Sequence, residues 1–293
     1  MLSIPHDVDS STGNVDYDGA VVIAQAVRDG MSVRATGNIE VAGLIGAAII
    51  ECGGDLIAQS GVAGRDRGKL LIRGNATAEY LEAVHGEVGG NLTVRERIVG
   101  CRLTVHGNIE APYATLMGGN VSVTGTVSLG TLGSPRHAAT RLELGFVPQL
   151  EPIAQRFEHI LNMLHARRSR LLDEQRRLST EASSPRERER QTELMFELGK
   201  LDSSIRRATS GLRGVMKEIQ RRYAVSVSIA HQLHEGVLLN VRGQVWRIDR
   251  DVAGPLQISL DTRGVIWTRE GRTAQLTEIG TLEEDHPSFR RAG

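Results

Sequence analysis

The sequence of 293 residues predicts a mainly β protein: a right-handed parallel β-helix of about seven coils, an inserted antiparallel coiled-coil hairpin, and C-terminal β-strands that return to the body. Three patterns predict this fold. A glycine motif recurs about every 17 residues, a long stretch then spaces its aliphatic residues by three and four, and alternation resumes near the C-terminus. Aromatic residues are only 3% of the chain and 33 residues are Gly, which suits a narrow core of small and branched aliphatic side chains.

The glycine motif establishes the period, and such internal repeats identify stacked architectures. Each Gly is followed by Asn, Asp or Ala and then by an aliphatic residue. The positions are Gly19, Gly37, Gly54, Gly74, Gly90, Gly107 and Gly119, with spacings of 18, 17, 20, 16, 17 and 12. A Gly here suits a corner that needs positive φ or close backbone approach, and the following Asn or Asp can close an Asx-type turn.

Within each repeat, aliphatic residues return at alternate positions in short runs, so each period is a coil of short strands with one face turned inward. Stacked coils about 4.8 Å apart can pair in parallel and enclose a continuous core. The expected inward side chains of the second coil are Ile39, Val41, Ile45, Ala48, Ile50 and Cys52, and those of the fifth are Leu92, Val94, Ile98, Cys101, Leu103 and Val105. A left-handed hexapeptide helix is the nearest alternative, but spacings of 17, 20 and 16 are not multiples of six.

The helical hairpin is expected over residues 148–223, after a β-helix over residues 8–147. The first predicted seam is Leu150, Ile153, Phe157, Ile160, Leu164, Leu171 and Leu178, with slots at Arg167 and Glu174; the second is Leu194, Leu198, Leu201, Ile205, Ala208, Leu212, Val215 and Ile219. The break at Ser183-Ser184-Pro185 makes the helices antiparallel. Alternation in residues 224–282 predicts strands that cap the β-helix, and residues 283–293 are expected to be disordered.

Charge and cysteine content exclude several classes of protein. There are 35 basic and 35 acidic residues, without the clustering of a nucleic-acid surface. No apolar run is long enough to span a bilayer, so a cytoplasmic location is expected. Cys52 and Cys101 form neither a disulfide framework nor a metal cluster, and we expect both to be buried in different columns of the β-helix, too far apart for a bond.

Several motifs resemble the flagellar assembly protein A family from about Val8 onward. They include Asp9–Gly19, Ala35–Gly43, Gly61–Lys69, Ala78–Ala83, Leu132–Pro135 and His234–Leu239. The resemblance implies a bacterial cytoplasmic protein linked to flagellar assembly, without catalytic residues. Family members usually carry another domain before the β-helix, so a short member or an excised fragment is expected. The aromatic residue and Pro that normally precede Gly236 are missing.

Candidate catalytic and metal sites receive little support. Counting three residues from each motif Gly gives Val22, Glu40, Ile57, Thr77, Thr93, Glu110 and Ser122, so no two carboxylates are adjacent in that column. Tyr80 and Tyr113 are expected to be lone surface residues, two coils apart. His231 and His234 have no further ligand pattern, so no metal or cofactor is expected.

The corner loop at Gly64–Lys69 superficially resembles a phosphate loop, but Ala63 and Leu70 replace the required Gly and Ser or Thr. We interpret it as a corner insertion of about three residues. The candidate partner contacts are Arg65, Arg67 and Lys69 in this loop and Arg167, Arg168, Arg188 and Arg190 in the hairpin.

Residues 151–222 carry 16 basic and 11 acidic residues, which favours an acidic protein partner or self-association through the hairpin. The leading hypothesis is a non-catalytic scaffold for flagellar assembly or placement. A self-polymerising cytoskeletal β-helix and a carbohydrate-active β-helix enzyme are the alternatives.

Overall fold

The computed structural model describes residues 1–136, 138–145, 150–181, 185–222, 225–241, 243–261 and 264–283. The chain divides into two compact units. One comprises Met1–Phe146 and Tyr223–Gly293, and the other is Val147–Arg222. They are described separately as the solenoid unit and the hairpin unit.

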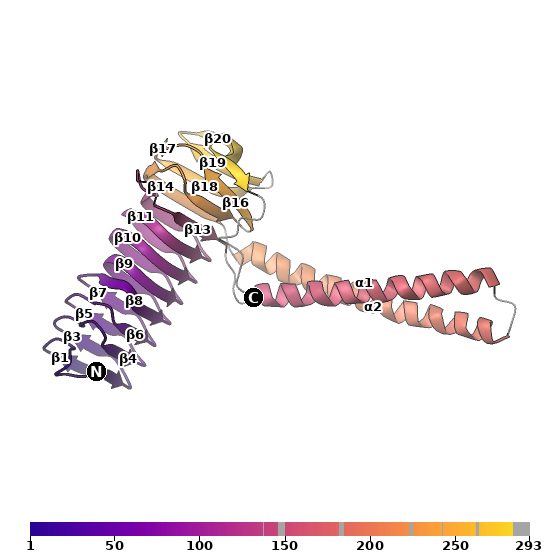
Figure 1. Cartoon of the computed structure of the whole chain (residues 1–293), viewed down its shortest axis with the longest axis horizontal. Helices are drawn as coiled ribbons and strands as arrows, with labels where there is room; N and C mark the ends of the chain where they lie inside the picture. The colour runs from indigo at the N-terminus through magenta and orange to yellow at the C-terminus, as the bar shows by residue number, and fades with distance from the viewer. Residues whose placement is uncertain are drawn as a thin grey trace. The chain divides into compact units, whose positions relative to one another are not determined.

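The solenoid unit begins with short strands that lengthen toward its middle (Figure 1). They are β1 (Leu2–Ile4), β2 (Val15–Tyr17), β3 (Val21–Ile23), β4 (Ser32–Ala35), β5 (Ile39–Val41), β6 (Ile49–Cys52), β7 (Leu56–Ala58), β8 (Val62–Ile72), β9 (Ala76–Val88), β10 (Leu92–Val105), β11 (Ile109–Val123), β12 (Val127–Leu132) and β13 (Thr140–Leu144). Every pairing among them is parallel, and each strand joins the one a coil away.

The register confirms a β-solenoid of about eight turns, one more than predicted. One column runs Leu2, Val21, Ile39, Leu56, Ala76, Leu92, Ile109, Val127 and Val227. The extra turn arises because the strand at residues 2–4 precedes the first predicted coil and the chain rejoins the stack after the hairpin. The right-handed sense remains a prediction from the spacings.

The core confirms the predicted inward face. All six inward residues of the second coil and all six of the fifth are at most 3% exposed. Cys52 and Cys101 are buried free thiols, as predicted. Cys52 aligns with Ala35 and Ile72, whereas Cys101 aligns with Gly119, so they occupy different columns.

One corner carries a stack of glycines, and it corrects the last predicted repeat. The N–H of each glycine donates to the carbonyl of the glycine one coil earlier, at 2.8–3.0 Å, through Gly19, Gly37, Gly54, Gly74, Gly90, Gly107 and Gly125. The prediction placed Gly119 last, but Gly119 lies in β11 opposite Cys101. Using Gly125 changes the final spacing from 12 to 18. Gly119-Asn120-Val121 matches the motif and Gly125-Thr126-Val127 does not, so the local sequence favours the wrong glycine and only the register identifies the right one.

These glycines are required by a ladder of side chains beside them. Each Asn or Asp of the ladder accepts the backbone N–H of the corresponding residue one coil later, at 2.7–2.9 Å, through Asn38, Asp55, Asn75, Asn91, Asn108 and Thr126. A Cβ added at Gly54, Gly74, Gly90, Gly107 or Gly125 would lie 2.0–2.4 Å from the Oδ1 of the preceding coil. These side chains therefore bridge neighbouring coils. The corner residues must be glycine because any Cβ there would collide with the side chain of the preceding coil. Positive φ occurs only at Gly19 in this stack.

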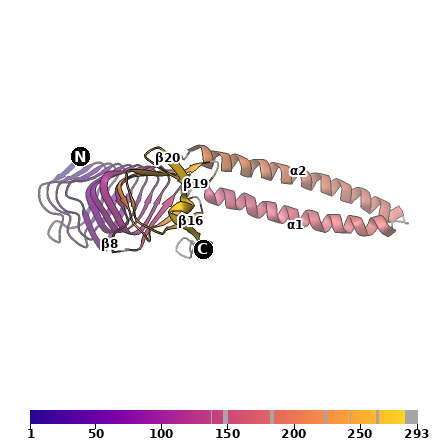
Figure 2. The ribbon, with the colours of Figure 1, turned by 90° about the horizontal axis from the view of Figure 1, so that it is seen from above.

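The hairpin unit consists of α1 (Glu151–Glu181) and α2 (Pro185–Arg222), which run antiparallel (Figure 2). The predicted α2 seam is confirmed at Leu194, Leu198, Leu201 and Ala208, each at most 8% exposed. The predicted α1 seam is partly wrong. Ala154 is 7% exposed whereas Ile153 is 43% exposed, and Arg168 rather than Arg167 is half-buried.

The correction on α1 has a geometric cause. Two seams are possible on α1, and both contain Phe157, Leu164 and Leu171. They differ at the positions in between, which can be taken one residue earlier, as at Ile153, or one residue later, as at Ala154. Packing on α2 selects the later set, because Arg168 Nε bonds Asp202 Oδ1 across the helix pair at 2.7 Å. The sequence alone could not decide this phase.

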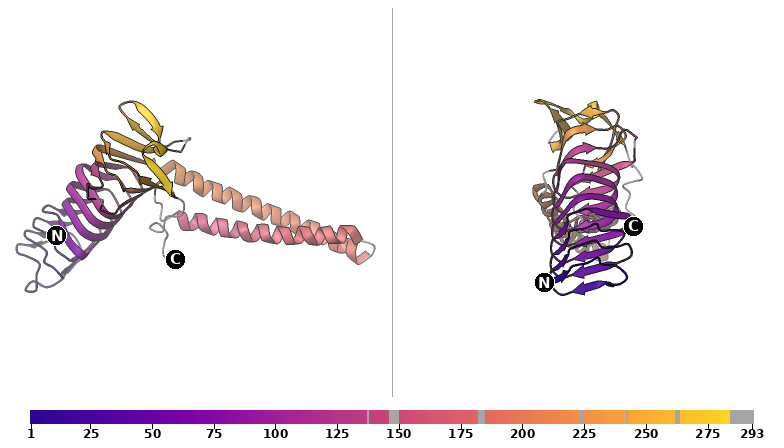
Figure 3. Two further views of the ribbon diagram at one scale, coloured as in Figure 1. Left: turned by 45° about the horizontal axis from the view of Figure 1, so that its top comes forward. Right: turned by 90° about the vertical axis from the view of Figure 1, so that its left-hand side faces the viewer.

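After the hairpin the chain completes the solenoid and then covers it (Figure 3). The elements are β14 (Ser226–Leu233), β15 (Leu238–Val241), β16 (Gln244–Ile248), β17 (Val252–Ala253), β18 (Leu256–Asp261), β19 (Gly264–Arg269), β20 (Arg272–Gln275), a 3₁₀ turn (Leu276–Glu278) and β21 (Gly280–Glu283). Strands β14 and β15 pair in parallel with β12 and β13. The next pairings are antiparallel, which covers the last parallel edges. Glu283 ends β21, and the rest of the predicted disordered tail lies outside the described residues.

Candidate functional site

The corner loop is a local insertion, as its sequence predicted. Ala63 pairs with Glu82 and Gly68 with Val84, so residues 64–67 oppose a single residue and the insertion is three residues long. The loop closes tightly, because a Cβ at Gly68 would lie 2.6 Å from the Cα of Gly64. The segment belongs to strand β8, which is unlike the strand-to-helix turn of a phosphate loop.

The three basic residues of the loop differ in their surroundings. Arg65 adopts φ 50° and pairs through Nη1 with Asp29 Oδ2 at 2.6 Å. Arg67 and Lys69 are exposed, and neither forms an ion pair with any described residue. The loop therefore leaves two cationic side chains available for a ligand.

Two of the four candidate arginines of the hairpin form close ion pairs between its helices. Arg168 pairs with Asp202, and Arg190 Nε pairs with Glu174 at 3.0 Å. Hydrogen bonding to Glu174 raises the pKa of Arg190 above its usual range. Arg167 approaches Glu197 at 3.8 Å, a weak contact.

Arg188 is exposed and forms no ion pair within the parts of α1 and α2 whose side chains are described. It is the one of the four hairpin candidates without an ion pair among these described residues. Whether any of the seven candidate residues contacts a partner remains a prediction.

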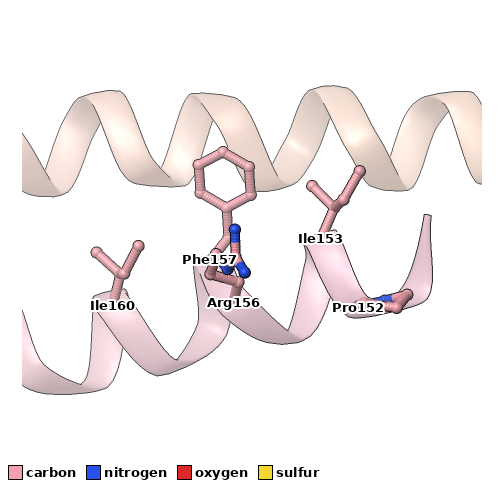
Figure 4. A pocket seen from close by; sticks show the side chains of 5 residues that line it. All are labelled: Pro152, Ile153, Arg156, Phe157 and Ile160. Carbon is pink, nitrogen blue, oxygen red and sulfur yellow. The ribbon is translucent and has the colours of Figure 1, made fainter. Parts of the chain in front are cut away.

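The hairpin also exposes apolar surface that the sequence prediction placed in the seam. Pro152, Ile153, Phe157 and Ile160 line a cavity of 160 Å³ with Arg156, and Figure 4 shows their side chains on α1. Gly211 of α2 makes room for the Phe157 ring, because a Cβ there would lie 2.6 Å from ring atoms. The signal in the sequence is that α1 begins with apolar residues at three heptad positions rather than two, which is typical of helices in bundles.

Further apolar side chains are exposed elsewhere on the hairpin. Met163, Met195 and Phe196 are 56%, 64% and 65% exposed. Lys200 Nζ lies 4.2 Å from the centroid of the Phe196 ring. Single exposed apolar residues are ordinary, but this unit combines them with the cavity on α1.

A polar cluster of the solenoid is the ion-pair network around Arg97. Its guanidinium bonds Glu82 at 2.8 Å and Glu96 at 2.7 Å, and it lies 4.3 Å from the Tyr80 ring centroid. Hydrogen bonding to Glu82 raises the pKa of Arg97. Both carboxylates are engaged by one cation, so the cluster does not resemble an acid and base poised on a sugar. Tyr113 is 81% exposed.

The register also tests the column that would carry paired carboxylates. Glu40 lies between Val22 and Ile57, and Glu110 lies between Thr93 and Ser128. The predicted last member, Ser122, is wrong because its position was counted from Gly119. No two carboxylates are neighbours in this column.

The two histidines of the His-x-x-His motif have different environments. His231 is exposed, whereas His234 is buried with Nδ1 3.3 Å from both oxygens of Asp251. Asp251 also accepts the backbone N–H of Glu235 at 2.8 Å. Among the described residues no three His, Cys, Asp or Glu side chains gather into a metal site.

The fold defines a class of protein: a parallel β-solenoid with a helical hairpin between its last two turns and antiparallel strands over its C-terminal end. The chain belongs to the flagellar assembly protein A family, because the model of that family's beta solenoid domain matches residues 1–265. The family is a non-enzymatic family connected with flagellar assembly. No curated protein and no solved structure matches the chain. In the described part of the chain, neither helix is apolar enough over a sufficient length to cross a membrane.

Proposed function

We propose that the chain is a non-catalytic bacterial scaffold that binds a protein partner in flagellar assembly or placement. The observation that supports this most is the hairpin, a separate compact unit with 38- and 31-residue helices, an apolar cavity and exposed apolar residues. Helix pairs of this kind offer an apolar and charged surface to a second helix. The solenoid contributes a rigid body whose polar groups are largely engaged in ladders and ion pairs.

The proposed setting is the bacterial cytoplasm. Both cysteines are free and buried, as is usual where thiols stay reduced. The family membership fits the same setting.

The proposed scaffold is tested by removing the hairpin. Residues 151–222 would be replaced by a flexible linker, and tagged full-length and shortened proteins would be used for affinity capture from the native cytoplasm. The scaffold hypothesis expects a specific partner with the full chain and its loss with the shortened one. An identical set of captured proteins would reject the hairpin as the recognition element.

Self-association through the hairpin is the second proposal for the same surface. Multi-angle light scattering of the full chain and the shortened chain separates it from binding of another protein. A dimer that becomes a monomer on removal of the hairpin identifies a second copy as the partner.

A polymerising β-helix is the weaker alternative. The C-terminal edges of the parallel sheets are paired with antiparallel strands, which opposes end-to-end stacking there. Electron microscopy of the purified protein would show filaments if this alternative were correct.

A further inference from the structure

Five residues from five successive coils form one outward-facing row on the solenoid. Lys69 pairs with His85, His85 with Arg102, Arg102 with Asn120, and Asn120 with Arg141. We call these residues the basic row. Because adjacent strands lie about 4.8 Å apart, the row is about 19 Å long and its three strongest bases recur at about 10 Å.

The cations of the basic row are unpaired, unlike most others of the solenoid. Lys69, Arg102 and Arg141 form no ion pair or side-chain hydrogen bond with the described residues. By contrast, the arginines at positions 28, 34, 65, 95, 97 and 247 all have carboxylate partners.

The acidic groups beside the row are already engaged. Glu87 contacts His106 Nε2 at 2.7 Å. Glu143 accepts from Ser122 Oγ at 2.8 Å and from Asn240 Nδ2 at 3.4 Å. Neither carboxylate pairs with a cation of the row, so Lys69, Arg102 and Arg141 form a line of three positive charges without carboxylate partners among the described residues.

A second observation concerns buried polar atoms in the same row. His85 Nε2, Asn120 Oδ1 and Arg141 Nε are buried and lack a hydrogen-bond partner among the described residues. Only three further such atoms occur in the described chain, on Trp246, Trp267 and Arg269. Buried polar groups are normally hydrogen-bonded, and three of the six exceptions among the described residues lie in this row.

We infer that the basic row binds an acidic polypeptide segment laid along the solenoid axis. Carboxylates of such a segment would pair with Lys69, Arg102 and Arg141. The inference rests on the proposed function in that it gives the chemistry of one protein contact, but it uses the solenoid rather than the hairpin.

The neighbouring row favours a peptide over a nucleic acid. The positions two residues further along the same strands include Glu87 and Glu143, which repel a continuous chain of phosphates. A polypeptide can place neutral or basic side chains over them. Neither row contains Phe, Tyr or Trp among the described residues, so the face lacks the aromatic platforms on which bases usually stack.

The test measures binding of a fluorescent peptide of alternating Glu and Ser to the purified full chain by anisotropy. Wild type should bind, and its affinity should fall as salt is raised. The double variant Lys69→Glu, Arg102→Glu should bind at least about tenfold more weakly, and Lys69→Gln, Arg102→Gln should lie between them. The matched control is Arg136→Glu, an exposed arginine outside the row, which should bind within about twofold of wild type.

Three results would overturn the inference. The peptide does not bind wild type; the row variants bind as wild type does; or a single-stranded DNA oligonucleotide of equal charge competes more strongly than the peptide. Thermal melting shows whether the variants are folded, and the glutamine pair supplies the answer if charge reversal unfolds the protein. Loss of partner capture on hairpin removal is a separate measurement, so failure here leaves the hairpin test standing.

Discussion

Replacing Gly90 with Ala tests whether the corner glycines are fixed by side chains of the preceding coil. A Cβ at this position would lie 2.4 Å from Asn75 Oδ1 and 2.9 Å from the carbonyl oxygen of Gly74. The same Oδ1 accepts the backbone N–H of Asn91 at 2.9 Å. The added methyl group must therefore displace the carboxamide or separate the coils.

The expected cost has two parts. Loss of the hydrogen bond is worth about 1 kcal/mol, and overpacking against the backbone costs roughly 1–3 kcal/mol. Gly90→Ala should thus lower the free energy of unfolding by about 2–4 kcal/mol, and Asn75→Ala alone by about 1 kcal/mol. In the double variant the hydrogen bond is lost only once and the contact of the new Cβ with Asn75 Oδ1 is gone, so its cost should fall short of the sum by at least about 1 kcal/mol.

Urea denaturation followed by circular dichroism measures the four proteins of this cycle. Gly199→Ala is the control, because a Cβ there meets no atom within 4 Å and Ala favours the helix by up to about 1 kcal/mol. Simple additivity of the two ladder substitutions would refute the reasoning, as would a Gly90→Ala protein as stable as wild type.

Three further predictions use other parts of the chain. Burial raises the pKa of Cys101 from 9.0 to about 11. Between these pH values the unfolded chain loses the thiol proton while the folded chain keeps it, so the free energy of unfolding should fall by up to about 1.4 kcal/mol per pH unit. Cys101→Ala should flatten that decline when melting is measured as a function of pH. Leu103→Asp buries an unpaired charge and should cost several kcal/mol, whereas outward Glu40→Ala should change stability by less than about 0.5 kcal/mol; equal melting temperatures would contradict the assigned faces. Replacing residues 151–222 with a flexible linker should leave a cooperative β-sheet melt, because the solenoid unit forms its own core, and an unfolded product would show that the hairpin is needed for folding.

The period and inward face of the solenoid could be predicted because they depend on residues close in sequence. Alternation around Ile39 and Leu92 marks the core face of a strand wherever that strand lies. The hairpin was equally visible, because a three-four spacing and a proline break are local signals. The corner loop at Gly64 appeared as extra length between two recognisable strands.

The register between coils and the packing between helices decided two points that the sequence left open. Gly119 is followed by Asn and Val and so matches the repeat motif, whereas Gly125 is followed by Thr and Val, and only pairing with the preceding coil identifies Gly125 as the corner. On α1, Ile153 and Ala154 fit the seam equally well until α2 is packed against it. In both cases the sequence allows two solutions, six residues apart at the corner and one residue apart on α1, and a distant segment selects between them.

The sequence by itself determined a β-solenoid, its buried residues and its helical insertion, since each follows from local periodicity and hydrophobic burial. Only the tertiary structure gathered Lys69, Arg102 and Arg141 into one row, because loops of different length make their spacing in the sequence irregular. The tertiary structure alone also showed that the corner residues are glycine because a larger residue would collide with the Asn or Asp side chain of the preceding coil. Both features arise from contacts between coils, and such contacts exist only once every strand has found its register.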